Sequence, residues 1–268
     1  YILASEKTSA LEIGDEPMQF HLKFPGISVA VCEDRLVAVP QILQDRLATN
    51  VIILDDAFQH RAIDAGLNIL LTQYGDLYTH DFFLPSGDLR DQKVSAERAH
   101  IIIVTKCPAD LSLEEKKLIE KEVNVAEGQT IYFTTLEYGM PYHILTKEEK
   151  PLSVEEEVLL VCGIANPEPL KKYLEENTAA FYQVHFSDHH IYSIDELKGI
   201  SKKFEQVQSS EKIILTTEKD AVRLIKFEKT LVDLPFYVLP VRNRFLFDDE
   251  IIFTTAIKQY IHSYKNQP

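Results

Sequence analysis

The feature that most constrains the fold is an apolar run followed at once by two carboxylates, Val-Ile-Ile-Leu-Asp-Asp at residues 51–56. Four consecutive apolar residues, three of them β-branched, predict a strand buried on both faces, because a half-exposed strand would alternate with polar residues. In an open parallel sheet, ligands bind at the carboxyl ends of the strands. We therefore expect Asp55 and Asp56 to lie where chemistry takes place.

The residues that follow add an amide, a titratable ring and a fixed cation within one turn, as Gln59, His60 and Arg61. A single aspartate after a strand is most often the N-cap of the next helix, so the complete string is more informative than either carboxylate alone. An apolar strand that ends in aspartate is also typical of nucleotide-triphosphate enzymes, where hard oxygen ligands hold Mg²⁺.

The rest of the chain alternates between apolar runs and amphipathic stretches. Strands are predicted at 28–32, 67–72, 101–106, 130–135, 158–162, up to 185, 212–216 and 236–241, and helices at 35–47, 112–123, 194–204 and 248–264. Such alternation predicts an α/β fold, here two α/β/α layered units with mainly parallel sheets. A polar stretch at 137–151 indicates a junction, which gives a domain over 1–148, with 246–268 packing back on it, and a smaller domain over 149–245.

Composition excludes some classes of function. The formal net charge of −14 argues against non-specific binding to nucleic acid, which needs basic residues to neutralise phosphates. Three widely spaced cysteines, Cys32, Cys107 and Cys162, form no metal-type pair, and free thiols in a reducing cytosol are expected. No stretch reaches the length of about 18 apolar residues needed to span a bilayer, and no signal peptide is visible. The chain opens at Tyr1 as if within a strand, so we expect a preceding segment.

Further motifs admit both structural and functional interpretations. Gly14-Asp15-Glu16-Pro17 is typical of a turn that caps a helix, and Arg90 lies in a long loop over 74–93, where it is equally consistent with a loop-pinning cation. At 186–190 the chain reads Phe-Ser-Asp-His-His, and two adjacent histidines on an extended segment point in opposite directions. The stretch 217–224 satisfies the rules for helix capping and charge, so a structural role is at least as good an explanation there.

Taken together, these motifs resemble the tetraacyldisaccharide 4′-kinase family. The matching strings are Asp-Asp-Ala-Phe-Gln-His-Arg at 55–61 and Phe-Ser-Asp-His at 186–189, supported by strings at 14–17, 84–91, 163–167 and 217–221. The resemblance implies a P-loop kinase that transfers the γ-phosphate of ATP to the 4′-hydroxyl of a tetraacylated disaccharide 1-phosphate in lipid A synthesis. It also implies a membrane glycolipid as partner, peripheral contact with the cytoplasmic face of the inner membrane, and no nucleic acid; the oligomeric state stays open.

The chain departs from the family at one point. A kinase of this type needs a Gly-x-x-x-x-Gly-Lys-Ser/Thr loop to hold the ATP phosphates, and no such string occurs in the 268 residues. We expect that loop to precede Tyr1, so the first domain is interpreted as an incomplete P-loop NTPase-like domain with no cofactor-binding residue of its own. The 268 residues alone are expected to show little or no phosphoryl transfer.

The resemblance leads to a hypothesis for the site. Asp55 acts as general base with His189 hydrogen-bonded to it, and Asp56 holds Mg²⁺ on the ATP phosphates, although the two aspartates could exchange roles. The remaining candidates contact the substrate, and these are Asp15, Gln59, His60, Arg61 and Arg90. Two alternatives remain at this point: a P-loop kinase of another lipid or sugar, and a non-catalytic glycolipid-binding module.

Overall fold

The computed structural model describes residues 1–265 and divides into two compact units. Unit 1 comprises Tyr1–Glu33 and Tyr138–Val241, and unit 2 comprises Asp34–Glu137 and the chain from Arg242 onward. Both consist of mainly parallel strands covered by helices, so the predicted α/β class is confirmed. Within the described residues, none of the helices has the length and apolar character that crossing a membrane would require.

Unit 1 is built on a five-stranded sheet in the order β6-β10-β9-β7-β8. Its strands are β6 (Tyr142–His143), β7 (Glu157–Cys162), β8 (Ala180–His185), β9 (Lys212–Thr217) and β10 (Phe236–Leu239). All neighbours pair in parallel except β6, which pairs antiparallel to β10 at the edge. The central strand β7 is almost wholly buried, as a continuous apolar run predicts.

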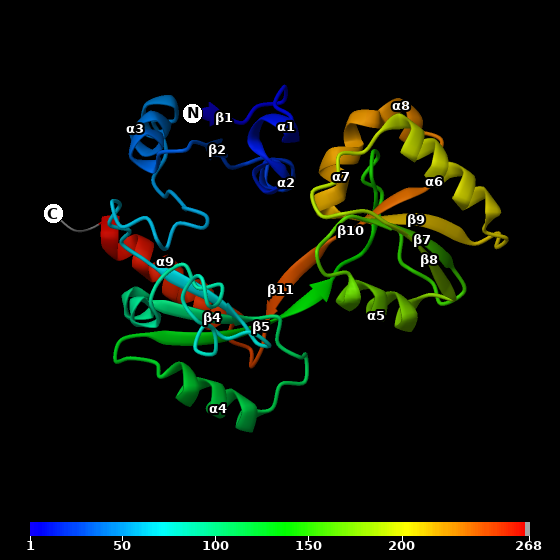
Figure 1. Ribbon diagram of the computed structural model, residues 1–268. Helices are drawn as coiled ribbons and strands as arrows, with labels where there is room; N and C mark the ends of the chain where they lie inside the picture. Colours follow the sequence, from blue (N-terminus) through cyan, green and yellow to red (C-terminus); the bar gives the residue numbers. More distant parts are fainter. Residues whose placement is uncertain (266–268) are drawn as a thin grey trace. The chain divides into compact units, whose positions relative to one another are not determined.

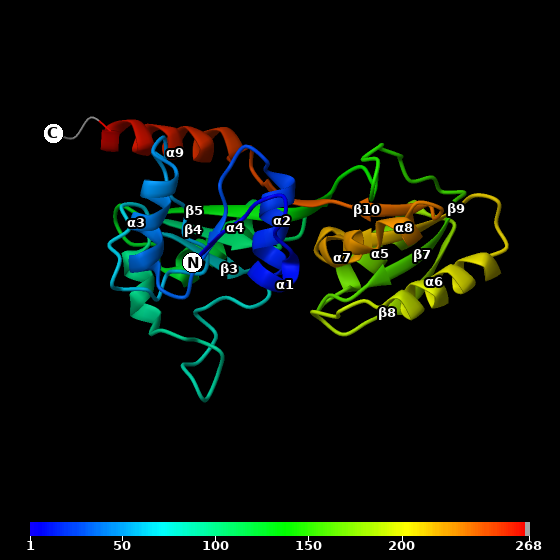
Figure 2. The ribbon, with the colours of Figure 1, turned by 90° about the horizontal axis from the view of Figure 1, so that it is seen from above.

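Helices cover both faces of this sheet (Figure 1). Helix α5 (Glu168–Asn177) packs on the face that holds Val158 and Leu160, whereas α6 (Ile194–Gln206), α7 (Glu218–Leu224) and α8 (Glu228–Leu231) pack on the face of Leu159 and Val161. A short 3₁₀ turn, η2 (Ile225–Phe227), joins α7 to α8. Seen from above, α6, α7 and α8 lie in front of the strands (Figure 2). Alternate residues of a strand thus pack into two separate hydrophobic cores, one on each face of the sheet.

The first 33 residues belong to unit 1. They form β1 (Ile2–Leu3), α1 (Ala10–Ile13), α2 (Asp15–Lys23) and β2 (Ala30–Val31), in which β1 and β2 pair antiparallel. Ile13 and Met18 form a small buried cluster with Val222 of α7. This contact places the amino-terminal segment on α7.

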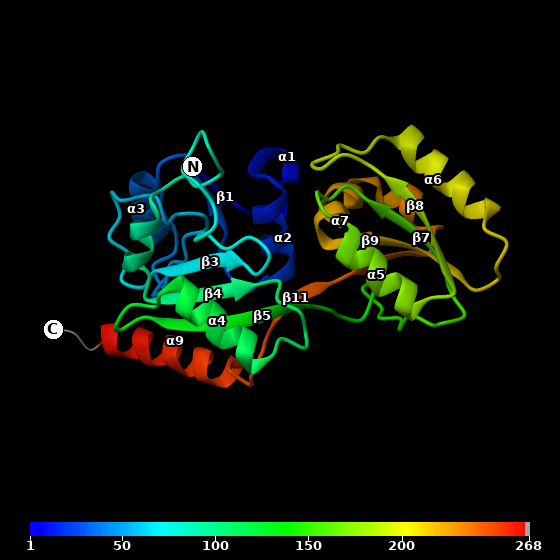
Figure 3. The same ribbon diagram turned by 60° about the horizontal axis from the view of Figure 1, so that its bottom comes forward.

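Unit 2 contains a four-stranded sheet in the order β11-β5-β4-β3 (Figure 3). The strands are β3 (Ile69–Gln73), β4 (Ile101–Thr105), β5 (Thr130–Tyr138) and β11 (Val241–Phe245). Helix α4 (Leu113–Val123) packs with Ile102 and Val104 of β4, and α9 (Glu250–Lys265) packs with Ile101 and Ile103 on the opposite face. The other helical segments are α3 (Arg35–Asp45) and η1 (Lys93–Arg98).

The predicted buried strand at 51–54 is wrong. Residues 51–54 adopt no regular structure, and Ile53 is 89% exposed. A strand needs a neighbour for its backbone groups, and within the described residues none pairs with this stretch. The strand predicted at 67–72 is present as β3 at the edge of its sheet, where Leu71 is 63% exposed.

The domain boundaries also differ from those predicted. The chain enters unit 1 at residue 138 and leaves it after residue 241, whereas the predicted smaller domain spans 149–245. Residues 1–33 also belong to unit 1, although they were predicted to lie in the other domain. The carboxyl-terminal helix α9 does pack in the same unit as β4 and β5. The amino-terminal segment belongs to unit 1 because it packs on α7, a helix about 200 residues further along the chain.

Candidate active site

Helix α7 of unit 1 begins with a cluster of charged residues. Its cap is Thr217, whose hydroxyl accepts a hydrogen bond from the backbone N–H of Asp220 at 3.1 Å. The helix follows β9 directly, so its first turn lies at the carboxyl end of that strand. Glu218, Asp220 and Arg223 are all buried. Burying a charge is costly unless it is paired and hydrogen-bonded, so the partners of these side chains show what the helix organises.

Arg223, which is only 7% exposed, holds the carboxylate of Asp15 at the start of α2. Its Nε donates to Oδ1 of Asp15 at 2.6 Å, its Nη2 donates to Oδ2, and its Nη1 donates to the carbonyl of His190 at 3.0 Å. Burial lowers the pKa of Arg223, but a guanidinium keeps its charge in proteins. This bidentate pair fixes α2 and the histidine loop on α7.

The same carboxylate contacts His189. Nδ1 of His189 lies 2.9 Å from Oδ2 of Asp15, and Nε2 lies 3.3 Å from Nζ of Lys219. The backbone of His189 is left-handed, with φ of 59°, and its N–H donates to the carboxylate of Asp188 at 3.0 Å. Because the imidazole side chain is 57% exposed while Asp15 is buried, the pair has one group in the interior and one that solvent can reach.

The neighbouring histidine has a different role. Nε2 of His190 lies 3.0 Å from the carboxylate of Glu196 on α6, and its ring stacks on Phe186 with the centroids 4.5 Å apart. His190 is therefore paired and stacked, whereas the His189 ring is the more exposed of the two, at 57% against 22%.

Asp220, which is fully buried, ties two further loops to α7. It accepts hydrogen bonds from the backbone N–H of Gly163 at 3.1 Å, the hydroxyl of Tyr192 at 3.0 Å and the hydroxyl of Thr217 at 2.7 Å. Burial, reinforced by this carboxylate, raises the pKa of Tyr192, so the phenol remains a donor. A Cβ at Gly163 would lie 2.8 Å from the carbonyl of Ser187, so only glycine fits there. Helix α7 thus gathers the segments at 14–17, 163–167 and 186–192.

In unit 2, the two aspartates after residues 51–54 lie in an exposed turn. Asp56 has a left-handed φ of 45°, and its carboxylate is held by Arg90, with Nη2 at 2.5 Å from Oδ1 and Nη1 at 3.1 Å from Oδ2. The hydrogen bond from Arg90 lowers the pKa of Asp56. Asp55 is exposed beside it. The predicted metal ligand and the predicted substrate arginine are therefore paired with each other.

A second ion-pair network pins the residues that follow. Asp91 accepts from Nη2 of Arg61 at 3.0 Å and from Nη2 of Arg98 at 2.9 Å, and the guanidinium of Arg98 lies 4.7 Å from the centre of the Phe58 ring. Gln59 and His60 lie between these contacts with exposed side chains. The turn at 55–61 is thus held to the long loop at 74–93 by two arginine–aspartate pairs.

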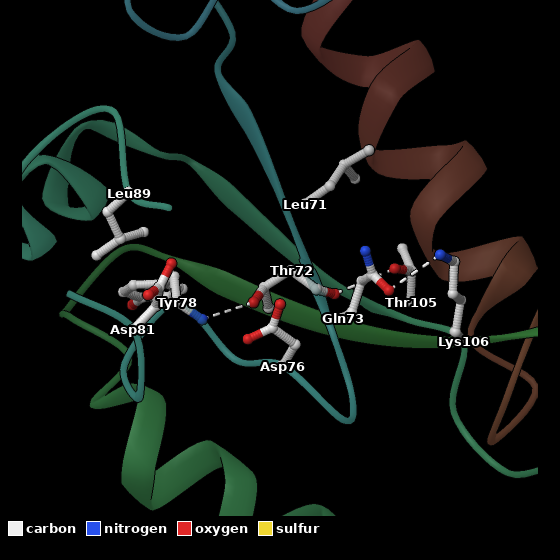
Figure 4. A pocket seen from close by; sticks show the side chains of 9 residues that line it. All are labelled: Leu71, Thr72, Gln73, Asp76, Tyr78, Asp81, Leu89, Thr105 and Lys106. Carbon is white, nitrogen blue, oxygen red and sulfur yellow. Dashed lines mark hydrogen bonds between the residues drawn. The ribbon is translucent and has the colours of Figure 1, made fainter. Parts of the chain in front are cut away.

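A hollow of about 340 Å³ lies at the carboxyl ends of β3 and β4 in unit 2 (Figure 4). Its lining is mixed, and it consists of Leu71, Thr72, Gln73, Asp76, Tyr78, Asp81, Leu89, Thr105 and Lys106. Nζ of Lys106 donates to the side-chain oxygen of Gln73 at 2.9 Å, and the hydroxyl of Thr72 accepts from the backbone N–H of Tyr78 at 2.9 Å (Figure 4). Strand carboxyl ends are the usual ligand side of such sheets.

Asp55 and Asp56 are the carboxylates that could supply oxygen ligands to a divalent cation. Within residues 1–265 there is no group of three His, Cys, Asp or Glu side chains that could hold a metal ion. Mg²⁺ is usually bound through only one or two carboxylates together with water and substrate phosphates. Asp55 and Asp56 supply that number of hard oxygen ligands, and Asp56 would have to exchange Arg90 for the ion.

Comparison with known proteins identifies the family. The sequence profile described as Tetraacyldisaccharide-1-P 4′-kinase matches residues 1–262. The chain belongs to the tetraacyldisaccharide-1-P 4′-kinase family. It is 41% identical over 265 residues to the tetraacyldisaccharide 4′-kinase of Flavobacterium johnsoniae, covering 97% of this chain and 74% of the relative. It is 38% identical over 269 residues to that of Phocaeicola vulgatus, with the same coverage.

A solved structure supports the assignment. The fold is similar to that of LpxK from Aquifex aeolicus, crystallised in complex with ATP, with a TM-score of 0.69 and 25% sequence identity. The similarity covers 97% of this chain and 74% of that one. The predicted family is therefore confirmed by both sequence and fold.

For a member of this kinase family, the structure gives His189 a carboxylate partner that differs from the predicted one. Asp15, predicted to contact the substrate, lies 2.9 Å from His189 within unit 1. Asp55, predicted to be the base beside His189, belongs to unit 2, so that pairing stays a prediction. Asp56, Gln59, His60, Arg61 and Arg90 all belong to unit 2, where Arg90 pairs with Asp56 and Arg61 with Asp91.

Sequence reasoning missed two cations that contact the segment at 186–190, namely Lys219 and Arg223. Both lie in the stretch that was interpreted as a capped helix start, and the capping is indeed present. The available signal was the number of charged residues immediately after a buried strand, which exceeds what a cap requires.

Proposed function

We propose that this protein transfers the γ-phosphoryl group of ATP to the 4′-hydroxyl of tetraacyldisaccharide 1-phosphate, a step of lipid A synthesis. The names of the similar proteins and the ATP complex of the similar structure support this activity. The observation that carries the proposal is the convergence on α7 of family segments far apart in sequence, with His189 and Asp15 paired at its centre. A phosphoryl acceptor that is an alcohol needs such a proton-accepting group.

The general base of this proposal is the pair formed by Asp15 and His189. The carboxylate of Asp15 orients the imidazole through Nδ1, and Arg223 holds that carboxylate in place. An acid–base group positioned in this way contributes about 10²–10⁴-fold to the rate. Asp15 and His189 are held close together because each contacts a cation of α7: Arg223 pairs with Asp15, and Lys219 contacts His189.

The aspartates of unit 2 are assigned to the nucleotide side of the reaction. Asp55 and Asp56 are the residues that would hold Mg²⁺, which when bound neutralises charge on the β- and γ-phosphates. Arg61 and Arg90 are exposed cations suited to a phosphate of the substrate, because a guanidinium binds phosphate in bidentate fashion. Gln59 and His60 contribute polar side chains next to them.

The proposed substrate determines where in the cell the protein would act. A tetraacylated disaccharide is a membrane glycolipid, so the protein is proposed to contact the cytoplasmic face of the inner membrane peripherally while it binds the sugar head group. The net charge of −14 gives no general attraction to anionic lipid, so such contact depends on local features.

Point variants of the full-length protein test the assignment of the base. His189→Ala and Asp15→Asn are each expected to lower kcat by about 10²-fold or more, and the double variant is expected to lose little beyond the larger single effect, because the residues act as a unit. His80→Ala, an exposed histidine of unit 2, is the matched control and is expected to retain activity.

Asp55→Asn separates the two possible partners of His189. If the base is Asp15 with His189, Asp55→Asn combines additively with His189→Ala and changes the Mg²⁺ dependence of the rate. Non-additivity between Asp55→Asn and His189→Ala, with Asp15→Asn near wild type, would restore the original assignment. Full activity of all three variants towards the glycolipid would refute the proposed kinase site.

A further inference from the structure

Lys219 occupies a position in which all its donors are used. Its Nζ lies 2.9 Å from Oδ1 of Asp188, 3.3 Å from Nε2 of His189 and 3.4 Å from Oε1 of Glu16. An ammonium group has three N–H donors and no acceptor. The hydrogen bonds to Asp188 and Glu16 raise the pKa of Lys219 despite its burial, so it is charged. In a hydrogen bond with Lys219, Nε2 of His189 can act only as the acceptor.

Two hydrogen-bond arrangements of the His189 ring are available from the surrounding groups. In the first, Lys219 donates to Nε2, and Nδ1 carries the proton and donates it to Asp15 at 2.9 Å. In the second, Nη2 of Arg223, also 2.9 Å from Nδ1, donates to that nitrogen. Nε2 then carries the proton and faces Oδ2 of Asp188 at 3.7 Å.

The second arrangement is opposed at both ring nitrogens. It places the Nε2 proton against the ammonium of Lys219, and it turns the lone pair of Nδ1 towards the carboxylate of Asp15. Arg223 has other acceptors for its donors, namely both oxygens of Asp15 and the carbonyl of His190. Without Lys219, however, the contacts of Arg223 with Nδ1 and of Asp188 with Nε2 would make the second arrangement competitive.

We infer that Lys219 is a positioning residue that selects the tautomer of His189 with its proton on Nδ1, next to Asp15. The charged groups that face the ring are Asp15 of α2, Lys219 and Arg223 of α7 and Asp188 of its own loop, and Glu16 contacts Lys219. The consequence for catalysis rests on the proposed function: Nε2 is the ring nitrogen left to accept the proton of the hydroxyl, while Nδ1 donates to Asp15.

Nitrogen NMR of protein labelled with ¹⁵N-histidine tests the tautomer without ATP or substrate. At about pH 8, above the ordinary titration range of histidine, wild type is expected to show a protonated Nδ1 and an unprotonated Nε2 at His189. The His189→Ala spectrum assigns the signals by difference. Lys219→Met is expected to show a substantial population with the proton on Nε2, and Lys219→Arg, which still only donates, is expected to restore the wild-type tautomer.

The controls separate this effect from loss of folding. Lys198→Met removes an exposed lysine of α6 with its own ion pair and is expected to leave the His189 signals unchanged. Melting temperatures report on the fold, and Lys219→Leu serves if the methionine variant is unstable, because it likewise offers no donor to Nε2. A wild-type ring protonated on Nε2, or a Lys219→Met spectrum identical to that of wild type, would overturn the inference.

Activity provides the second readout. In the full-length kinase, Lys219→Met is expected to lower kcat with little change in KM, because a ring that carries its proton on Nε2 has no lone pair there to accept the proton of the hydroxyl. A loss confined to KM would contradict a positioning role. If the NMR result holds and no kinase activity is found with any variant or wild type, the inference about Lys219 stands and the proposed function fails.

Discussion

Arg223 with Asp15 in unit 1 and Arg90 with Asp56 in unit 2 are both arginine–aspartate pairs, and they differ in burial. In unit 1, Arg223 and Asp15 have side-chain exposures of 7% and 11%, and Arg223 also reaches the histidine loop. In unit 2, Arg90 and Asp56 have exposures of 57% and 64% and lie between a turn and a long loop. The same two residue types thus form an internal support in one unit and a surface contact in the other.

This difference in burial determines how readily each pair can separate. A buried pair that loses one member leaves an uncompensated charge in the interior, so it cannot exchange partners without cost. An exposed pair contributes little to stability, because water solvates both members when they separate. The pair at Arg90 and Asp56 can therefore release its groups to a phosphate or a metal ion, whereas that at Arg223 and Asp15 holds a fixed geometry for His189.

The largest expected effect is on the buried pair. Arg223→Met is expected to lower the free energy of unfolding by about 3 kcal/mol or more, because it leaves the buried carboxylate of Asp15 without its cation. Arg90→Met in unit 2 is expected to change it by less than about 0.5 kcal/mol. Urea denaturation followed by circular dichroism measures both. Equal losses for the two variants would show that burial does not distinguish these pairs.

A smaller loss of unfolding free energy is expected when Asp220, which bonds two loops to α7, loses one hydrogen bond. Tyr192→Phe removes one donor from the fully buried Asp220, and a hydrogen bond to a charged group is worth about 1.5–3 kcal/mol. Tyr182→Phe, on an exposed tyrosine of the same unit, is the control and should be neutral. Denaturation midpoints measure the difference. A neutral Tyr192→Phe would mean that Asp220 is satisfied by Gly163 and Thr217 alone.

Elements with complete local signals were predictable from sequence. Helices α4 and α6 begin at Ser112 and Ser193 with glutamates three residues on, and both capping boxes are formed. The buried strands β4 and β9 likewise follow their apolar runs. The pattern at 51–54 failed because an apolar run defines a strand only when a neighbouring strand pairs with it.

The site was predictable only as a set of residues, not as a set of contacts. Asp15 and His189 were both identified, but their pairing joins positions 174 apart, and nothing local indicates it. Arg223 is 208 positions from Asp15 and resembles any arginine on a short helix. Burial made these residues important, and burial depends on the packing of α2 on α7, which no local pattern specifies.

The smallest expected effect on stability is that of the exposed pair in unit 2, Arg90 with Asp56. Arg90 lowers the pKa of Asp56 from its ordinary value of 3.8, so the pair stabilises the fold above that range and loses this contribution as the pH falls through the lowered value. Arg90→Gln is expected to return the pKa of Asp56 towards 3.8, as measured by carbon NMR titration of the carboxyl group, with Arg46→Gln on the same unit as control. The accompanying change in unfolding free energy at neutral pH should remain below about 0.5 kcal/mol, since both side chains are exposed. An unchanged titration of Asp56 in Arg90→Gln would mean that the two groups are already separated in solution, and that the carboxylate is available to a cation without any exchange of partners.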